Sequence, residues 1–179
     1  NIFTELGKAG YATSMIGKCH FAPVPYDETK PDRTLPYDDF KEYYMSLGID
    51  HLELQDDKQV SVWYYDDYSK ELDRAGYLKE YRDCTWNDSL GKVFPFPGPV
   101  QWHPDAWVGD HGAHFIEAVS SGEKPQFTWI SFSGPHYPFD APQECYGRVN
   151  QDGLPSCRRR EGELEDAARI HHDSYFGGG

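Results

Sequence analysis

Residues 10–20 read GYATSMIGKCH, and this stretch decides the fold. Tyr11 to Ile16 is a short and mostly apolar run with aromatic and β-branched members, and Gly10 and Gly17 bound it. Such a run is typical of a strand buried inside an α/β sheet. The sequence therefore predicts a buried strand here, at the start of an α/β fold.

Lys18 and His20 come directly after this predicted strand. Open α/β sheets bind their ligands just beyond the carboxyl ends of their strands. A lysine offers a compact positive charge, and a histidine donates or accepts a proton near neutral pH. Together they suit an oxyanion such as sulfate or phosphate. The alternative is a solvated lysine and a structural histidine in a loop, because the K-x-H pattern alone is weak.

A second strand is predicted over Gln126 to Phe132, where bulky residues follow one another almost without interruption. Such continuity indicates a strand that is buried on both faces. The chain then reads SGPHYPF, so that His136 also falls just past the end of a strand. Two buried strands thus deliver polar, titratable side chains to the same kind of edge, which favours a functional pocket.

The rest of the chain is predicted from helical periodicity and turn residues. Asn1 is expected to cap a first helix. Further helices are expected over Tyr37 to Leu47, Asp66 to Arg82 with a break at Gly76, Pro104 to Val119, and Glu161 to Tyr175. A short strand is expected over Gln59 to Tyr65, and loops over Phe21 to Pro36, Cys84 to Trp102, and Asp140 to Arg160.

Composition limits the classes of function. The 179 residues suffice for one α/β domain with a real core. The formal net charge of −13 argues against a nucleic-acid partner, which needs a basic face, but it leaves room for a locally positive pocket. No apolar run approaches the roughly 20 residues that span a bilayer. The four cysteines, at positions 19, 84, 145 and 157, show no zinc-like spacing and leave the redox compartment undecided.

The two strand motifs resemble those of the type I sulfatases. The first, Gly10-Tyr11-Ala12-Thr13 with Ile16-Gly17-Lys18-Cys19-His20, is similar to the family's G-Y-x-T-x-x-x-G-K-W-H segment. The second, residues 127–139, is similar to the family's later strand and its P-H-x-P loop. The motifs occur in the family's order. The resemblance is tight over residues 1–20 and 102–142.

The resemblance implies an alkaline-phosphatase-like α/β/α sandwich, a central sheet flanked by helices and interrupted by insertions. Within a partial sulfatase catalytic domain at 1–179, residues 1–20 and 102–142 would be core. Residues 21–101 would be a variable insertion region, and 143–179 a loop and helix. Because the chain begins without Met and ends in Gly177-Gly178-Gly179, we expect an internal fragment of a longer protein. We expect this fragment to be inactive alone, because the family's nucleophile motif and calcium-binding Asp pairs are missing from it.

The resemblance also implies roles. Lys18 would bind the sulfate, His20 would contact the nucleophile and take its proton when sulfate leaves, and His136 would bind a sulfate oxygen and help protonate the leaving alcohol. The family uses a formylglycine nucleophile and a calcium ion. Neither the C/S-x-P-S-R motif nor the calcium-binding Asp pairs occur here, so no metal ligand is assigned, and Cys19 stands where the family has Trp.

Several alternatives stay open. The motifs separate sulfate poorly from phosphate, so a phosphonate monoester or phosphodiester hydrolase is one alternative, and a non-catalytic sulfatase-like module is another. The expected partner is a sulfated small molecule or glycan. The resemblance implies a periplasmic, secreted or lysosomal location, as in most of the family, and a cytoplasmic location is the alternative.

Other polar residues are expected to have structural or solvated roles. The acidic pairs Asp56-Asp57 and Asp66-Asp67 are expected to be solvated. Surface positions are expected for the three histidines near the Pro104 helix, which are His103, His111 and His114. The run Arg158 to Arg160 is interpreted as a solvated loop, and the pair His171-His172 as a poor ligand set.

Overall fold

The computed structural model describes residues 1–20, 35–36, 38–58, 64–87 and 93–156. The chain divides into two compact units, Asn1–Tyr146 and Gly147–Gly179. Of the second unit, residues 147–156 are described, and they contain the short 3-10 helix η2, Gln151–Gly153.

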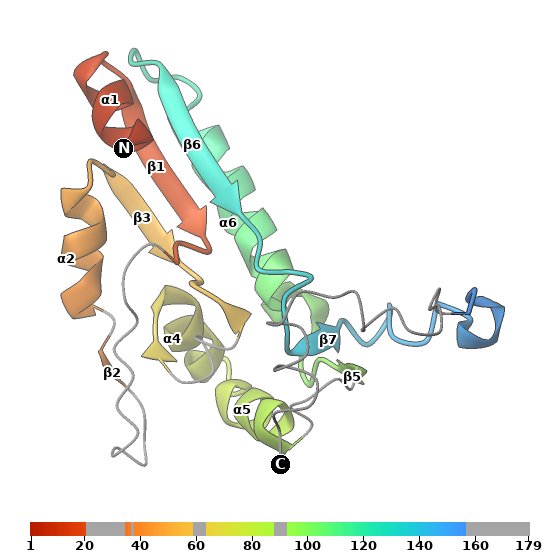
Figure 1. Cartoon of the computed structure of the whole chain (residues 1–179). Coiled ribbons are helices and arrows are strands. Elements are labelled where there is room, and N and C mark those ends of the chain that lie inside the picture. Colours follow the sequence, from red (N-terminus) through yellow and green to blue (C-terminus); the bar gives the residue numbers. More distant parts are fainter. Residues whose placement is uncertain (21–34, 37, 59–63, 88–92, 157–179) are drawn as a thin grey trace, which may run out of the picture. The chain divides into compact units, whose positions relative to one another are not determined.

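The centre of the first unit is a three-stranded parallel sheet in the order β3-β1-β6 (Figure 1). Its strands are β1 (Ala12–Gly17), β3 (His51–Leu54) and β6 (Gln126–Ser131). In the register, Met15 of β1 lies opposite Leu52 of β3 and Trp129 of β6. Because the strands are parallel, all three end at the same edge of the sheet. The strands predicted from residues 11–16 and 126–132 are therefore confirmed.

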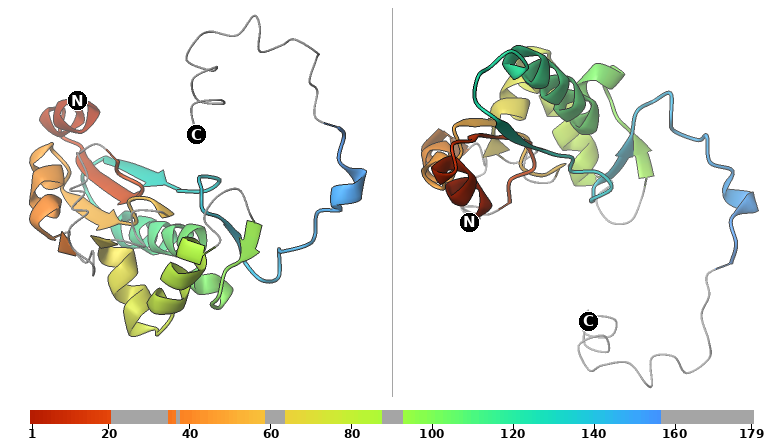
Figure 2. Two further views of the ribbon diagram at one scale, coloured as in Figure 1. Left: turned by 60° about the horizontal axis from the view of Figure 1, so that its bottom comes forward. Right: turned by 90° about the horizontal axis from the view of Figure 1, so that it is seen from above.

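Five α-helices surround this sheet among the described residues. They are α1 (Ile2–Lys8), α2 (Asp38–Ser46), α4 (Asp67–Arg74), α5 (Leu78–Asn87) and α6 (Pro104–Val119). The Asn1 side chain accepts a hydrogen bond from the Thr4 N–H and caps α1, as predicted. Gly76, with φ of +86°, lies at the predicted break between α4 and α5. Figure 2 shows α4 and α6 on one side of the sheet.

A hydrophobic core lies on each face of the sheet. On β6, Phe127 packs against a cluster that includes Phe3 of α1 and Tyr44 of α2. Ile130 points to the opposite face and packs against the cluster of α4, α5 and α6. Side chains at odd and even positions of a strand face opposite ways, so one strand contributes to both cores. The layered α/β/α arrangement agrees with the expected partial alkaline-phosphatase-like fold.

Shorter elements complete the unit. The strands β2 (Leu35–Pro36) and β4 (Tyr64–Tyr65) pair in parallel, and so do β5 (Val93–Pro95) and β7 (Phe139–Ala141). The 3-10 helix η1 (Val100–Trp102) leads into α6. The described part of the chain has no helix that is both long and apolar enough to cross a membrane.

Several predictions about these elements were wrong. The loop predicted over Phe21 to Pro36 ends in β2, and the loop predicted over Asp140 to Arg160 contains part of β7 and η2. The strand β3 was missed, because its sequence HLEL is short and half polar. The predicted loop from Cys84 to Trp102 contains the end of α5 as well as β5 and η1. The strand β6 is not buried on both faces, since Trp129 is 42% exposed. Its pairing partner is β1 alone among the described strands, so its outer edge is uncovered in this part of the chain.

Some predictions fall outside the described residues. They concern most of the loop from Phe21, most of the short strand from Gln59, the helix Glu161 to Tyr175, the run Arg158 to Arg160 and the pair His171-His172.

Candidate anion-binding site

The turn that follows β1 places Lys18 at the carboxyl edge of the sheet. Gly17 has φ of +99°, and a Cβ there would overlap the carbonyl oxygen of Ser131 in β6. The Lys18 N–H donates to that same carbonyl at 2.8 Å. Only glycine fits such a turn without strain. The close approach to β6 therefore explains why the motif has a glycine immediately before Lys18.

One carboxylate, that of Asp57, lies among the three predicted site residues. The Lys18 Nζ donates to Asp57 Oδ2 at 2.9 Å, and His20 Nδ1 lies 3.7 Å from the same oxygen. His136 Nδ1 lies 3.4 Å from the other oxygen, Oδ1. Since one carboxylate contacts all three, the structure brings Lys18, His20 and His136 together, although His136 lies more than 110 residues along the chain from the other two. We call these four residues the Asp57 cluster.

The neighbouring residue Asp56 holds the backbone of this turn. Its Oδ1 accepts hydrogen bonds from the Cys19 N–H at 3.0 Å and from the His20 N–H at 2.6 Å. The Asp56 N–H in turn donates to Asp66 Oδ2 at 3.2 Å. Asp56 and Asp66 are both buried. Asp56 therefore fixes the course of the chain beneath Lys18 and His20.

The loop that carries His136 is held by its own contacts. The Gly134 N–H donates to Asp105 Oδ1 at 2.9 Å, and a Cβ at Gly134 would overlap the Asp105 carboxylate. The His136 N–H donates to the Ser133 carbonyl at 3.0 Å. His136 Nδ1 lies 2.7 Å from the Tyr137 carbonyl oxygen. The imidazole is thus anchored at Nδ1, which leaves Nε2 on the far side of the ring.

Behind the Asp57 cluster lies a group of buried charges. Lys58 Nζ contacts Asp140 Oδ1 at 2.6 Å, and the Tyr81 hydroxyl donates to Asp140 Oδ2 at 2.8 Å. His103 Nε2 lies 3.6 Å from the same Oδ2. Burial opposes ionisation of Asp140, but the nearby His103 imidazole and the Lys58 charge outweigh it and lower its pKa. These contacts join the residue after Asp57 to the strand β7, which follows His136.

The acidic pairs and the histidines near α6 differ from their predicted roles. The expectation that they are solvated is wrong for Asp56, Asp57 and Asp66, which are buried. His103 is not a surface residue either, because it is buried and caps α6 by accepting a hydrogen bond from the Asp105 N–H. The sequence did contain a signal for Asp57. The polar run Gln55 to Lys58 follows β3 just as Lys18 and His20 follow β1.

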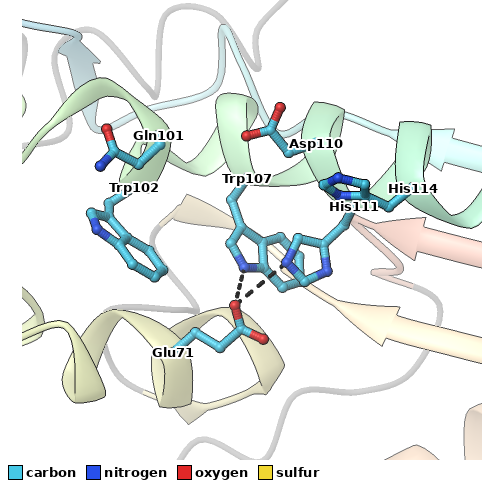
Figure 3. Close-up of a pocket in the computed structure, with 7 residues that line it drawn as sticks. All are labelled: Glu71, Gln101, Trp102, Trp107, Asp110, His111 and His114. Atoms are coloured by element: carbon cyan, nitrogen blue, oxygen red, sulfur yellow. Dashed lines mark hydrogen bonds and ion pairs between the residues drawn. The ribbon is translucent and has the colours of Figure 1, made fainter.

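A second cluster of acids and imidazoles lies beside a cavity of about 210 Å³ (Figure 3). His111 of α6 contacts Glu53 through Nδ1 and lies 3.4 Å from Glu71 Oε2 through Nε2. The Trp107 indole stacks on His111 and donates to Glu71 at 2.8 Å. His51 Nε2 contacts Glu53 at 2.7 Å. We call this group, centred on Glu53 and His111, the Glu53 cluster.

The acids and imidazoles of the Glu53 cluster shift one another's pKa values. Burial opposes ionisation of Glu53, but hydrogen bonds and charge from His111 and His51 hold its pKa at about 2. Burial also opposes protonation of His111, but Glu53 and Glu71 outweigh this effect and raise its pKa. His111 was predicted to be a surface residue, and it is instead half-buried and bound on both ring nitrogens.

The described residues contain no cluster that could hold a metal ion, and the Cys19 thiol is unreactive. In that part of the chain, no group of three or more His, Cys, Asp and Glu side chains could hold a metal ion. These residues therefore do not fit the calcium ion that the sulfatase resemblance implies. The Cys19 thiol is buried, and burial together with the Asp56 charge raises its pKa well above the ordinary value. It stays protonated and is not a nucleophile.

The layered fold defines an α/β protein with basic side chains gathered at the carboxyl edge of its sheet, and comparison with known proteins specifies the class. The sulfatase family model matches residues 1–161. The chain therefore belongs to the sulfatase family. It is 27% identical over 157 residues to a protein named arylsulfatase from Clostridium perfringens (strain 13 / Type A). That match covers 86% of this chain and 30% of the relative, so the chain spans about a third of the relative's length.

Proposed function

We propose that this chain forms the sulfate-binding part of an enzyme that hydrolyses sulfate esters. The observation that carries the proposal is the convergence of Lys18, His20 and His136 on one point at the carboxyl edge of the sheet. Membership of the sulfatase family and the name of the Clostridium relative support sulfate over other anions. A sulfated small molecule or glycan is the substrate class that fits.

The proposed roles follow from charge and proton chemistry. The Lys18 ammonium and the His136 imidazole bind sulfate oxygens, where negative charge grows in the transition state. His136 Nε2 is free of the Tyr137 contact, so it donates a proton to the leaving alcohol oxygen. His20 is more than half exposed and accepts a proton beside the bound anion.

These roles belong to residues of this chain alone. The described residues do not provide the calcium ligands or the formylglycine that sulfatases generally use, and we assign no step to either group. We place both in the full-length protein, since the relative is about three times as long as the matched segment.

The test is hydrolysis of 4-nitrophenyl sulfate and 4-nitrophenyl phosphate by the full-length protein. We expect a preference for the sulfate ester, and a loss of at least about 10²-fold in kcat/KM for Lys18→Ala and for His136→Ala. Lys8→Ala is the matched control, because Lys8 is exposed and pairs with Glu5 one helical turn away. Its kcat/KM should not change.

Each other outcome contradicts the proposal in its own way. A preference for the phosphate ester favours a phosphonate monoester or phosphodiester hydrolase of the same fold. Sulfate binding without turnover favours a non-catalytic sulfatase-like module. Full activity of Lys18→Ala and His136→Ala would show that these residues do not form the sulfate-binding site.

A further inference from the structure

We infer that Asp57 is a positioning residue, which holds the Nδ1 side of both imidazoles and the Lys18 ammonium so that they face one bound anion. This inference rests on the proposed function, and it assigns a role to a residue that the sequence motifs do not mark. It concerns the geometry of the site rather than a contact between Asp57 and the substrate.

Burial separates Asp57 from its three partners. The Asp57 side chain is 3% exposed, whereas the side chains of Lys18, His20 and His136 are 22%, 53% and 46% exposed. The carboxylate therefore lies beneath the three basic groups, and they form the surface that a solute meets. An anion approaching this edge reaches the cations and not the carboxylate.

Asp57 faces the same nitrogen of each ring, without a hydrogen bond to either. Both imidazoles present Nδ1 to it, at 3.7 Å for His20 and 3.4 Å for His136. The Tyr137 carbonyl can only accept a hydrogen bond, so the proton of neutral His136 must lie on Nδ1. Nε2 then remains for the anion or for a leaving oxygen. When the ring is protonated, both nitrogens carry protons and Nε2 becomes a donor.

The position of Asp57 is fixed on both sides along the chain. Before it, Asp56 is bound to the backbone beneath Lys18 and His20, and the Gln55 N–H donates to the Gly17 carbonyl at 3.3 Å. After it, Lys58 is 3% exposed and paired with Asp140. One oxygen of Asp57, Oδ1, is buried and has no hydrogen-bond partner among the described residues. This oxygen faces His136. Because its neighbours along the chain fix the Asp57 carboxylate, we infer that the carboxylate in turn orients the His136 ring.

An alternative role for Asp57, in which its charge only repels or competes with the anion, predicts the opposite change in sulfate affinity. If the carboxylate only repelled or competed with an anion, removing its charge would strengthen sulfate binding. If it positions the three basic groups, removing its charge weakens sulfate binding even though the site becomes more positive. The sign of the change in affinity therefore distinguishes the two roles.

The experiment compares the full-length wild-type protein with Asp57→Asn and with the control Asp83→Asn. Asp83 is an exposed acid on α5 that pairs with Lys79. Inorganic sulfate is titrated against each protein. Two-bond ¹H–¹⁵N NMR spectra of histidine-labelled protein report which ring nitrogen carries the proton. We expect the proton on Nδ1 of neutral His20 and His136 in the wild type. In Asp57→Asn, we expect His20 to move to the Nε2–H form and sulfate to bind at least tenfold more weakly.

The outcomes are separable from those of the proposed function. Unchanged or tighter sulfate binding by Asp57→Asn overturns the inference, and so does an Nε2–H form of His136 in the wild type. The tautomer of His136 is measured in the wild type, so it tests the inference even if Asp57→Asn fails to fold. If the wild type binds no sulfate, the proposed function fails, and a change of the His20 tautomer in Asp57→Asn would then still show that Asp57 orients that ring.

Discussion

Two clusters of acids and imidazoles depend on the same strand, β3, and they differ in charge and exposure. Asp57, just after β3, is a single buried acid beneath three partly exposed basic groups. Glu53, within β3, belongs to a cluster in which two acids face two imidazoles and all are half-buried. Both clusters consist of acidic and basic side chains, but the ratio of basic to acidic groups differs between them.

This difference explains why only one cluster is proposed to bind an anion. In the Asp57 cluster, basic groups outnumber the acid and lie on the outside, so an oxyanion meets positive charge first. In the Glu53 cluster, the acids match the imidazoles, and both nitrogens of His111 already face carboxylates. A count of histidines near a sheet edge does not separate the two, whereas the position of the acids does.

The largest expected effect comes from the buried charges behind Asp57. Lys58→Met removes the lysine that neutralises Asp140, whose side chain is fully buried and keeps only its contacts to Tyr81 and His103 among the described residues. An uncompensated buried charge costs about 3–5 kcal/mol of unfolding free energy. Urea denaturation at pH 7 measures this loss, with Lys79→Met on the exposed face of α5 as the control. A loss below about 1 kcal/mol would show that the Asp140 region is not held by this pair.

A smaller, pH-dependent effect is expected in the Glu53 cluster. His111→Gln should lower the unfolding free energy by about 1 kcal/mol near pH 5.5, because the pair is partly exposed and solvent weakens it. The lowered pKa of Glu53 contributes stability above its ordinary value of 4.5, which is lost as the pH falls towards 2. The raised pKa of His111 contributes stability below 6.5, which is lost as the pH rises through the raised value.

The difference between His111→Gln and the wild type should therefore be greatest between about pH 4.5 and 6.5 and should shrink at pH 9. Urea denaturation over this range measures it. His114→Gln, an exposed position one turn further along α6, is the matched control. A difference that is the same at pH 5.5 and pH 9 would exclude an ion pair at His111.

The sequence predicted those parts of the fold whose signals are local. The helix Pro104–Val119 has both predicted bounds, because its proline and its apolar periodicity lie within its own residues. The strand β1 and its Gly17 turn were found for the same reason. The convergence of His136 with Lys18 was expected from two strands that end in polar residues, and the structure places them around one carboxylate.

The features that the sequence missed depend on partners far along the chain. The strand β3 has four residues, too few for a clear alternating pattern, and its burial comes from pairing with β1. Asp56 and Asp57 look like a solvated acidic pair until that pairing brings them beneath Lys18 and His20. His103 has a buried role that follows from capping α6 and from Asp140, which lies in β7.

The most direct test of the account is to locate an oxyanion in crystals of the full-length protein soaked in sodium selenate, using the anomalous scattering of selenium. The account predicts one selenate at the carboxyl edge of the sheet, with its oxygens about 3 Å from Lys18 Nζ and from Nε2 of His136. Selenate bound elsewhere, or His136 turned so that Nε2 meets Asp57, would contradict it.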